Sequence, residues 1–160
     1  MAPGTRCRGN GSAGPEVRRQ LQPADLGLQL RADDEAGLFG WFLASFLAGK
    51  RISQGVAART WEVMVRGHGC DTPARLCARS HGELVRMLGE GGYRRYDQSA
   101  ATMLRQLCHD LRQDYGGGIL GVLAASGDRA DFERRLLAFR GVGPVTLRIF
   151  MEQAGPVLFR

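Results

Sequence analysis

The chain has 160 residues, of which 44% are hydrophobic and 24% charged, which suits one soluble globular domain with a core and leaves too little chain for two. Lysine and arginine number 22 against 16 aspartates and glutamates, so the net charge of +6 favours a polyanionic partner, nucleic acid first and an acidic membrane second. No apolar run reaches the roughly 18 residues that a membrane span needs, and the longest, 38–48, lies too far inside the chain for a signal peptide.

Lysine and cysteine, two residue types that carry much of protein chemistry, are scarce or scattered. Lys50 is the only lysine, so a Schiff base that needs a side-chain amine has one possible position. The cysteines form no CxxC pair and no group of four with the spacing of a zinc or iron–sulfur site. We therefore expect no metal and no cofactor, and we expect free thiols in a reducing cytosol at Cys7, Cys70, Cys77 and Cys108.

Residues 1–32 are predicted to form a disordered basic tail. Gly, Pro, Arg and Ser dominate its first half, and no hydrophobic period is visible. Because such a tail has few apolar groups to bury, we expect it to be dispensable for folding. Its arginines would still add non-specific affinity for a polyanion, and they are Arg6, Arg8, Arg18 and Arg19.

A helical domain is predicted over 33–160, because helix start signals recur there without the alternation typical of strands. Asp33 or Asp34 caps a helix that is apolar nearly all round, which places it at the centre of the core. Proline after Thr72 and a capping box from Ser80 to Glu83 open two further helices. The full set of predicted helices is 34–48, 53–66, 73–76, 81–90, 96–115, 119–125, 131–139 and 144–155, an all-α fold.

The most specific pattern of the chain lies at 136–146, where one helix ends, a Gly-Val-Gly turn follows and a new helix begins at Pro144. Both glycines of the turn can take positive φ, and without a Cβ they leave room for a close partner. The first N–H groups of the new helix lack an acceptor within the helix and lie at the positive end of its dipole, where a phosphate fits. Arg140 and Arg148 flank the turn with positive charge. In the alternative interpretation, the glycines only shape an ordinary helix–helix corner.

The stretch Phe-Arg-Gly-Val-Gly-Pro-Val-Thr at 139–146 resembles the helix-hairpin-helix signature of the endonuclease III and 3-methyladenine DNA glycosylase superfamily. Weaker similarities precede it in the family's order, at 42–46, 53–65, 72–76 and 92–100. The resemblance covers roughly 36–155 and implies a multi-helix glycosylase-like domain with its helix-hairpin-helix motif at about 131–154. It implies that the phosphate backbone of double-stranded DNA is contacted by Arg140, Gly141, Val142, Gly143, Val145, Thr146 and Arg148.

The chain departs from this family where the family carries its catalytic side chains. Val145 stands at the position of the Schiff-base lysine of bifunctional members, so we expect no lyase activity unless Lys50 is recruited. The family aspartate would fall beyond Arg160, and no aspartate follows Asp131. Phe46 stands where the family has a glutamine. We therefore expect a truncated or degenerate relative whose catalytic residue is unknown.

Three further features are candidates for functional roles: one carboxylate, the histidines and an aromatic-basic patch. Glu152, the only carboxylate after the hairpin, shares a helical face with Val145 and is a candidate for stabilising an oxocarbenium-like sugar, or alternatively a solvated helix carboxylate. The scattered residues His68, His81 and His109 are interpreted as surface polar groups. An aromatic-basic patch would stack on an extruded base or contact phosphate, or alternatively form a plain helix entry, and it comprises Tyr93, Arg94, Arg95 and Tyr96.

These patterns lead to three hypotheses about function. The first is a DNA glycosylase that hydrolyses the N-glycosidic bond of a flipped, damaged base with water and has no lyase activity. The second is a non-catalytic helical DNA-binding module, and the third is a helical protein-interaction module in which the hairpin is a corner. For a DNA-binding protein of this kind we expect a monomer without membrane association, located in the cytoplasm and, in a prokaryote, on the nucleoid.

Overall fold

The computed structural model describes residues 19–160, and the regular structure of these residues is entirely helical, which confirms the predicted all-α class. A short 3-10 helix, η3 (Pro23–Leu26), precedes the others, and a π-helical turn, η4 (Glu62–Gly67), follows α2 directly. The α-helices are α1 (Glu35–Ala48), α2 (Gln54–Trp61), α3 (Pro73–Cys77), α4 (His81–Glu90), α5 (Asp97–Tyr115), α6 (Ile119–Ala125), α7 (Arg129–Leu137) and α8 (Pro144–Leu158).

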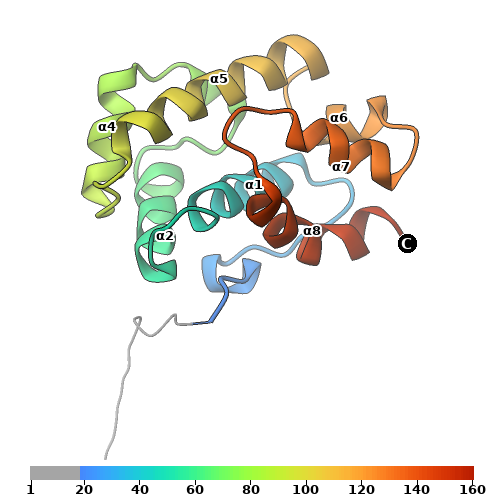
Figure 1. The fold of residues 1–160 in the computed structure, drawn as a ribbon, viewed down its shortest axis with the longest axis horizontal. Helices are drawn as coiled ribbons and strands as arrows, with labels where there is room; N and C mark the ends of the chain where they lie inside the picture. Colours follow the sequence, from blue (N-terminus) through green and yellow to red (C-terminus); the bar gives the residue numbers. More distant parts are fainter. Residues whose placement is uncertain (1–18) are drawn as a thin grey trace, which may run out of the picture.

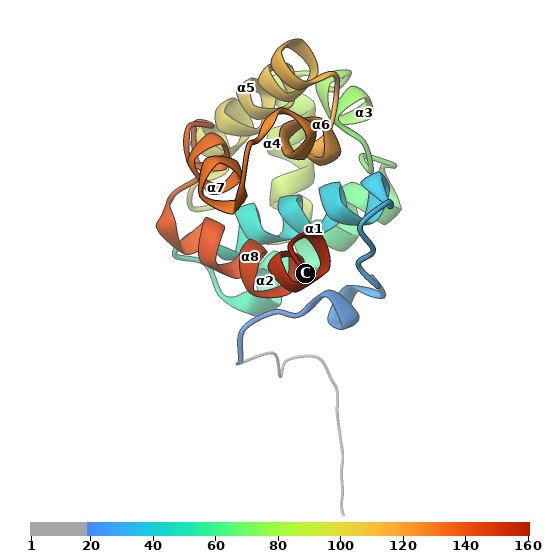
Figure 2. The ribbon, with the colours of Figure 1, turned by 90° about the vertical axis from the view of Figure 1, so that its right-hand side faces the viewer.

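The helices form two groups, with the connection between α7 and α8 running from one to the other. Helix α1 packs against α2 and α8, and α5 packs against α3 and α4 (Figures 1 and 2). Figure 1 shows the α7–α8 connection lying between α5 and the α1–α8 pair. The turn between α7 and α8 therefore lies against both groups of helices.

Most of the helices begin at a side-chain cap, as the local sequence predicts. Asp34, Ser53, Thr72, Ser80 and Asp128 each accept a hydrogen bond from the backbone N–H three residues later. The predicted capping box is present, since the carboxylate that ends it accepts from the backbone N–H of Ser80 at 2.8 Å. Each such cap satisfies a donor that the helix itself leaves unpaired, which is why these boundaries can be read locally.

Helix α1 is buried on every face, as its apolar sequence predicts. Its indole at Trp41 donates from Nε1 to the carbonyl oxygen of Phe150 at 3.2 Å, and Trp61 of α2 donates from Nε1 to the carbonyl oxygen of Gly40 at 2.8 Å. Phe42 meets Phe150 edge to face with ring centroids 5.2 Å apart. Hydrogen bonds and ring packing therefore tie α2 and α8 to the same buried helix.

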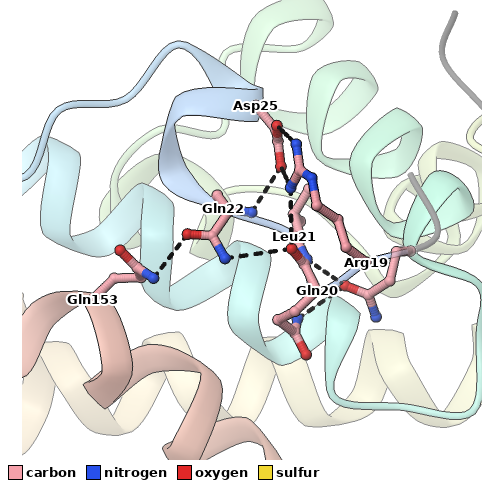
Figure 3. A network of polar contacts seen from close by, with 7 residues as sticks. Arg19, Gln20, Leu21, Gln22, Asp25 and Gln153 are labelled. Atoms are coloured by element: carbon pink, nitrogen blue, oxygen red, sulfur yellow. Dashed lines mark hydrogen bonds and ion pairs between the residues drawn. The ribbon is translucent and has the colours of Figure 1, made fainter. Parts of the chain in front are cut away.

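The prediction that residues 1–32 form a disordered tail is wrong for residues 19–32, which dock on the helices (Figure 3). Leu21 and Leu26 are each only 1% exposed. The backbone N–H of Leu21 donates to Oε1 of Gln54 at 2.9 Å, and Nε2 of Gln153 donates to Oε1 of Gln22 at 2.9 Å. These partners lie far along the chain, so local composition gives no sign of them.

The remaining part of the predicted tail, residues 1–18, lies outside the described residues, and so do the arginines at positions 6, 8 and 18. Arg19 is described, and its guanidinium forms an ion pair with Asp25 at 2.7 Å, which also raises the pKa of the arginine. Its charge is therefore paired within the fold instead of standing free for a polyanion.

Three helices differ from their predicted bounds. Helix α7 runs over Arg129–Leu137 instead of 131–139, because the side chain of Asp128 caps it by accepting from the N–H of Asp131 at 2.8 Å. The last helix, α8, continues to Leu158 instead of fading near Gly155, although Pro156 lies within it. Its final turn is retained because Phe159 packs on Phe132 with ring centroids 5.5 Å apart, and this contact outweighs the hydrogen bond that proline cannot make. The predicted helix 53–66 becomes π-helical at Glu62.

Among the described residues, none of the helices combines the length and the apolar composition needed to cross a membrane.

We predict that Leu26→Ala lowers the free energy of unfolding by about 2–4 kcal/mol, because it opens a cavity where η3 meets the core. Leu137→Ala is the matched control, since Leu137 is 42% exposed and its truncation should change stability by less than about 0.5 kcal/mol. Urea unfolding followed by circular dichroism measures both. Equal midpoints for the two variants would show that residues 19–26 do not dock in solution.

Candidate nucleic-acid interface

A short turn joins α7, which ends at Leu137, to α8, which begins at Pro144 as predicted. The turn is closed by a hydrogen bond from the N–H of Val142 to the carbonyl oxygen of Phe139 at 3.1 Å. Gly141 has φ +87°, the positive φ that glycine permits. Gly143 could also have taken positive φ, but its φ of −105° and ψ of −174° are extended backbone that any residue adopts.

Gly141 is required for close packing as well as for its φ. A Cβ at this position would lie 2.8 Å from Sδ of Met103 in α5 and 2.8 Å from Cε2 of Phe46 in α1. Such distances are shorter than carbon and sulfur atoms tolerate, so a side chain here would push the turn away from both helices. The missing side chain therefore fixes where the hairpin lies.

The N-terminus of α8 has no side-chain cap, because its N-cap residue is Gly143. Pro144 carries no N–H, and the first backbone hydrogen bond of the helix runs from Leu147 to the carbonyl oxygen of Gly143 at 3.0 Å. The backbone N–H groups of Val145 and Thr146 have no hydrogen-bond acceptor within residues 19–160. A Cβ built on Gly143 meets no atom within 4 Å, so the approach to this helix end is open.

Side chains around the turn divide into exposed and buried ones. Arg140 and Arg148 are exposed, and Val145 is 49% exposed. Val142 and Thr146 were predicted to contact DNA, but as whole residues they are only 5% and 1% exposed, so little of either lies at the surface. The exposed part of the candidate interface is therefore Val145 and the two arginines, beside the uncapped start of α8.

Thr146 is buried because it closes the contact between the start of α8 and the end of α1. Its Oγ1 fills the space that a side chain at Gly49 would occupy, so glycine at that position admits the threonine. The contact places the open end of α8 beside the residue that follows Gly49, namely Lys50.

Lys50 reaches the turn from the end of α1, a proximity that the sequence-based prediction missed. Its Nζ donates to the carbonyl oxygen of Gly141 and lies 4.4 Å from the centroid of the Phe46 ring. Burial lowers the pKa of the Lys50 amine, since it disfavours the charged form. The two residues are 91 positions apart, so neither hydrophobic period nor local motif could indicate the contact.

A pocket of about 320 Å³ opens beside Lys50, between the end of α1 and the start of α5. Tyr93 and Tyr96 from the connection between α4 and α5 form part of its wall. The Tyr93 hydroxyl is buried and has no hydrogen-bond partner among the described residues, and burial raises its pKa. The complete lining is Gly49, Lys50, Arg51, Tyr93, Tyr96, Ser99, Ala100 and Met103.

The structure divides the predicted aromatic-basic patch at 93–96. Tyr93 is fully buried and belongs to the core, which is the plain helix-entry alternative for that ring. Arg94 and Arg95 are exposed, and the Arg95 guanidinium lies 5.3 Å from the centroid of the half-buried Tyr96 ring. The tyrosines therefore face a pocket, while the two arginines lie at the surface.

Glu152 is exposed on α8 and forms an ion pair with Arg148 one turn earlier, at 3.5 Å. Both side chains are about half exposed, so solvent screens the pair and it contributes little to stability. This arrangement matches the solvated-carboxylate alternative.

A second, more polar pocket of about 550 Å³ lies between α3, α4 and α5, and no motif indicated it. Three basic side chains of α5 line it at a spacing of three and four residues, Arg105, His109 and Arg112. This spacing is visible in the sequence, but on an exposed helix face it is ordinary, so only the fold shows that a hollow lies beside it.

Residues 19–160 contain no group of three or more His, Cys, Asp or Glu side chains that could hold a metal ion. Within the same range the cysteines are free, and Cys70 and Cys108 are buried. Burial raises the pKa of the Cys70 thiol, so this group is a poor nucleophile at neutral pH.

Comparisons of the chain with protein-family models, with curated proteins and with solved structures find no match. The resemblance to helix-hairpin-helix glycosylases therefore rests on the residues of the hairpin and the weaker upstream similarities alone.

We predict that Gly141→Ala lowers the free energy of unfolding by about 2–4 kcal/mol, the sum of left-handed backbone strain and overpacking against Phe46 and Met103. Gly143→Ala is the control and should cost less than about 1 kcal/mol, because its φ is ordinary and its Cβ would meet open space. Thermal and urea unfolding measure both. If the two substitutions cost the same, the hairpin is not packed against α1 and α5 as described.

Proposed function

We propose that the chain binds double-stranded DNA through the phosphate backbone, at the turn between α7 and α8. The observation that carries the proposal is the open N-terminus of the 15-residue helix α8, which has two backbone N–H groups without acceptors and no capping side chain. An anion placed there completes the hydrogen bonds that the helix leaves unmade and lies at the positive end of its dipole.

The charges near this end support an anionic ligand. Arg140 is exposed and forms no ion pair with any described residue, and Arg148 is exposed one turn into α8. The chain as a whole carries a formal charge of +6. In the proposed mode the backbone N–H groups and the arginines contact phosphates, which carry no sequence information. The binding should therefore show little sequence preference and should weaken steeply with salt.

The proposal is limited to binding, because the surroundings of the turn offer no clear catalytic group for base excision. Valine at position 145 carries no nucleophile, and Glu152 is exposed and paired with Arg148. Hydrolysis of an N-glycosidic bond needs a carboxylate close to the sugar in a water-poor site, which Glu152 does not provide. The turn therefore supports the DNA binding of the glycosylase hypothesis but not its catalytic step.

A protein-interaction surface is the second candidate, and one observation favours it. A groove between α7 and α8 has an apolar part, and Leu137 in it is 42% exposed. The apolar lining residues are Leu137, Pro144, Leu147 and Met151, and the charged ones are Arg129, Glu133, Arg148 and Glu152. Exposed apolar side chains beside a groove are typical of surfaces that bind a partner chain. We prefer DNA binding, because a partner in this groove would leave the start of α8 without hydrogen-bond acceptors.

The proposal predicts that Gly143→Asp weakens DNA binding without unfolding the protein. The extended backbone at Gly143 suits an N-cap aspartate, whose carboxylate would accept from the N–H of Thr146 and occupy the place of the phosphate. Loss of a charge-assisted bond and the added repulsion should weaken binding by about 2 kcal/mol, which is about 30-fold. Fluorescence anisotropy with a labelled duplex at low salt measures the affinity.

Two matched variants separate charge from shape at the same position. Gly143→Asn also caps the helix but adds no charge, and Gly143→Ala adds only the Cβ. We expect the loss of affinity to follow the order Asp, Asn, Ala, while the melting temperature of the Asp variant stays at or above that of the parent. If a folded Asp variant binds the duplex as tightly as the parent, the hairpin is only a corner and the protein-interaction candidate moves ahead.

A further inference from the structure

The polar pocket of about 550 Å³ lies on the group of helices formed by α3, α4 and α5, which Figure 2 shows packed together. We propose that this pocket binds a small sugar that carries a phosphate group at each end. Its lining comes from α3, α4 and α5 and includes no residue of α7, α8 or the turn between them. The inference is therefore independent of the proposed DNA binding at the hairpin.

The lining is positively charged and contains no carboxylate that would neutralise it. Arg105 and Arg112 contribute two guanidinium groups from α5. Neither forms an ion pair with a carboxylate of residues 19–160. An arginine without such a partner keeps its N–H donors for a ligand, and a phosphate matches the planar guanidinium with paired hydrogen bonds. Phosphate is therefore the anion that these two side chains suit best.

Acidic residues close to the lining in sequence do not cancel this charge. Asp110 accepts a hydrogen bond from Nε2 of Gln106 at 3.0 Å. Glu83 accepts from the backbone N–H of Ser80 at 2.8 Å and is held there as part of the capping box of α4. Asp114 is exposed and does not line the pocket. An anion in the pocket would thus meet the arginines before it meets a carboxylate.

The spacing of the arginines indicates two anionic groups instead of one. Arg105 and Arg112 are seven positions apart on α5, so they share one face of the helix and lie about 10 Å apart along its axis. His109 lies between them on the same face. A separation of this size is too long for a single phosphate but suits the two ends of a phosphorylated hexose. A bisphosphate can therefore engage both arginines at once.

Polar lining residues keep acceptor atoms that suit the hydroxyl groups of a sugar. Gln106 uses Nε2 as a donor to Asp110, so its Oε1 remains an acceptor. The Thr102 hydroxyl donates to the carbonyl oxygen of Gln98 at 3.1 Å and keeps its lone pairs. Nε2 of His81 lies 3.2 Å from the same carbonyl oxygen, which only accepts, so Nδ1 of the neutral ring is left as an acceptor. Sugar hydroxyls can donate to all three.

The composition of the lining argues against a nucleotide or a lipid headgroup with its chains. No Phe, Tyr or Trp ring and no large aliphatic side chain belongs to it, and Cys77 is its least polar member. A nucleobase gains most of its affinity by stacking on such rings, and an acyl chain needs an apolar surface. A volume of about 550 Å³ is within the usual range for a small-molecule site.

The first test is a calorimetric titration of the full chain with fructose 1,6-bisphosphate at physiological salt, where weak surface binding of anions is screened. We expect one site per chain, with fructose 6-phosphate bound about 10-fold more weakly and fructose not bound. Arg105→Gln and Arg112→Gln should each weaken the bisphosphate about 10-fold, the effect of one lost charge-assisted contact. Arg86→Gln is the matched control, because it removes the same charge from an exposed position of α4 outside the lining.

The thiol of Cys77 gives a second, local measurement. It is half-buried and lines the pocket, so a bound ligand should cover it, whereas Cys70 and Cys108 are buried elsewhere in the core. With the bisphosphate at about ten times its Kd, alkylation of Cys77 by iodoacetamide should slow about 10-fold by mass action, as read by peptide mass spectrometry. Equal slowing at Cys70 and Cys108 would show general stabilisation instead of a ligand in the pocket, and would overturn the inference.

A DNA duplex distinguishes this pocket from a second contact with the phosphate backbone. Arg105→Gln should weaken the bisphosphate and leave the duplex affinity within about 2-fold, whereas Arg140→Gln should weaken the duplex and leave the bisphosphate unchanged. If Arg105→Gln weakens the duplex as much as Arg140→Gln does, α5 contacts DNA and the inference is overturned. The same holds if the bisphosphate binds no more tightly than inorganic phosphate, or if Arg105→Gln has no larger effect than Arg86→Gln.

Discussion

The position of the hairpin depends on one steric constraint, the absence of a side chain at Gly141. The turn approaches α1 and α5 at once, and a Cβ would collide with Phe46 on one helix and Met103 on the other. The same approach places Thr146 against Gly49. It also brings the Lys50 amine within hydrogen-bond distance of the carbonyl oxygen of Gly141. The open end of α8 and the adjacent pocket are thus consequences of a single close approach.

The electrostatics of this region come from three separate segments of the chain. Arg140 and Arg148 flank the turn, Lys50 and Arg51 follow α1, and the exposed arginines at 94 and 95 precede α5. Few carboxylates offset them: Glu152 pairs with Arg148, and the described ion pairs of the other acidic residues lie elsewhere. A phosphate backbone laid over the turn would therefore meet positive charge from residues that only the fold brings together.

How much the sequence predicts depends on whether the determining contact is local. The caps at Asp34, Ser53 and Ser80 involve residues three positions apart, so the helix starts follow from the sequence. The docking of Leu21 on Gln54 and the burial of Thr146 against Gly49 depend on partners far along the chain, and both were missed.

The candidate site divides in the same way. The Gly-Val-Gly turn identified the hairpin, but glycine permits either sign of φ, so the sequence could not tell that Gly141 alone requires the positive one. The pocket beside Lys50 has no sequence pattern at all, because its walls come from the ends of α1, the α4–α5 connection and the start of α5. Residues that are close in space but follow no periodic pattern cannot be identified from the sequence.

In the proposed binding mode, the backbone N–H groups at the start of α8 receive a phosphate. A titration of isotopically labelled protein with a short DNA duplex at low salt, followed through the amide resonances in NMR, tests this contact. We expect the amides of Val145 and Thr146 to shift most strongly and to return when salt is added. Shifts centred on Arg105 and Arg112 of α5, with the amides of Val145 and Thr146 unmoved, would contradict it.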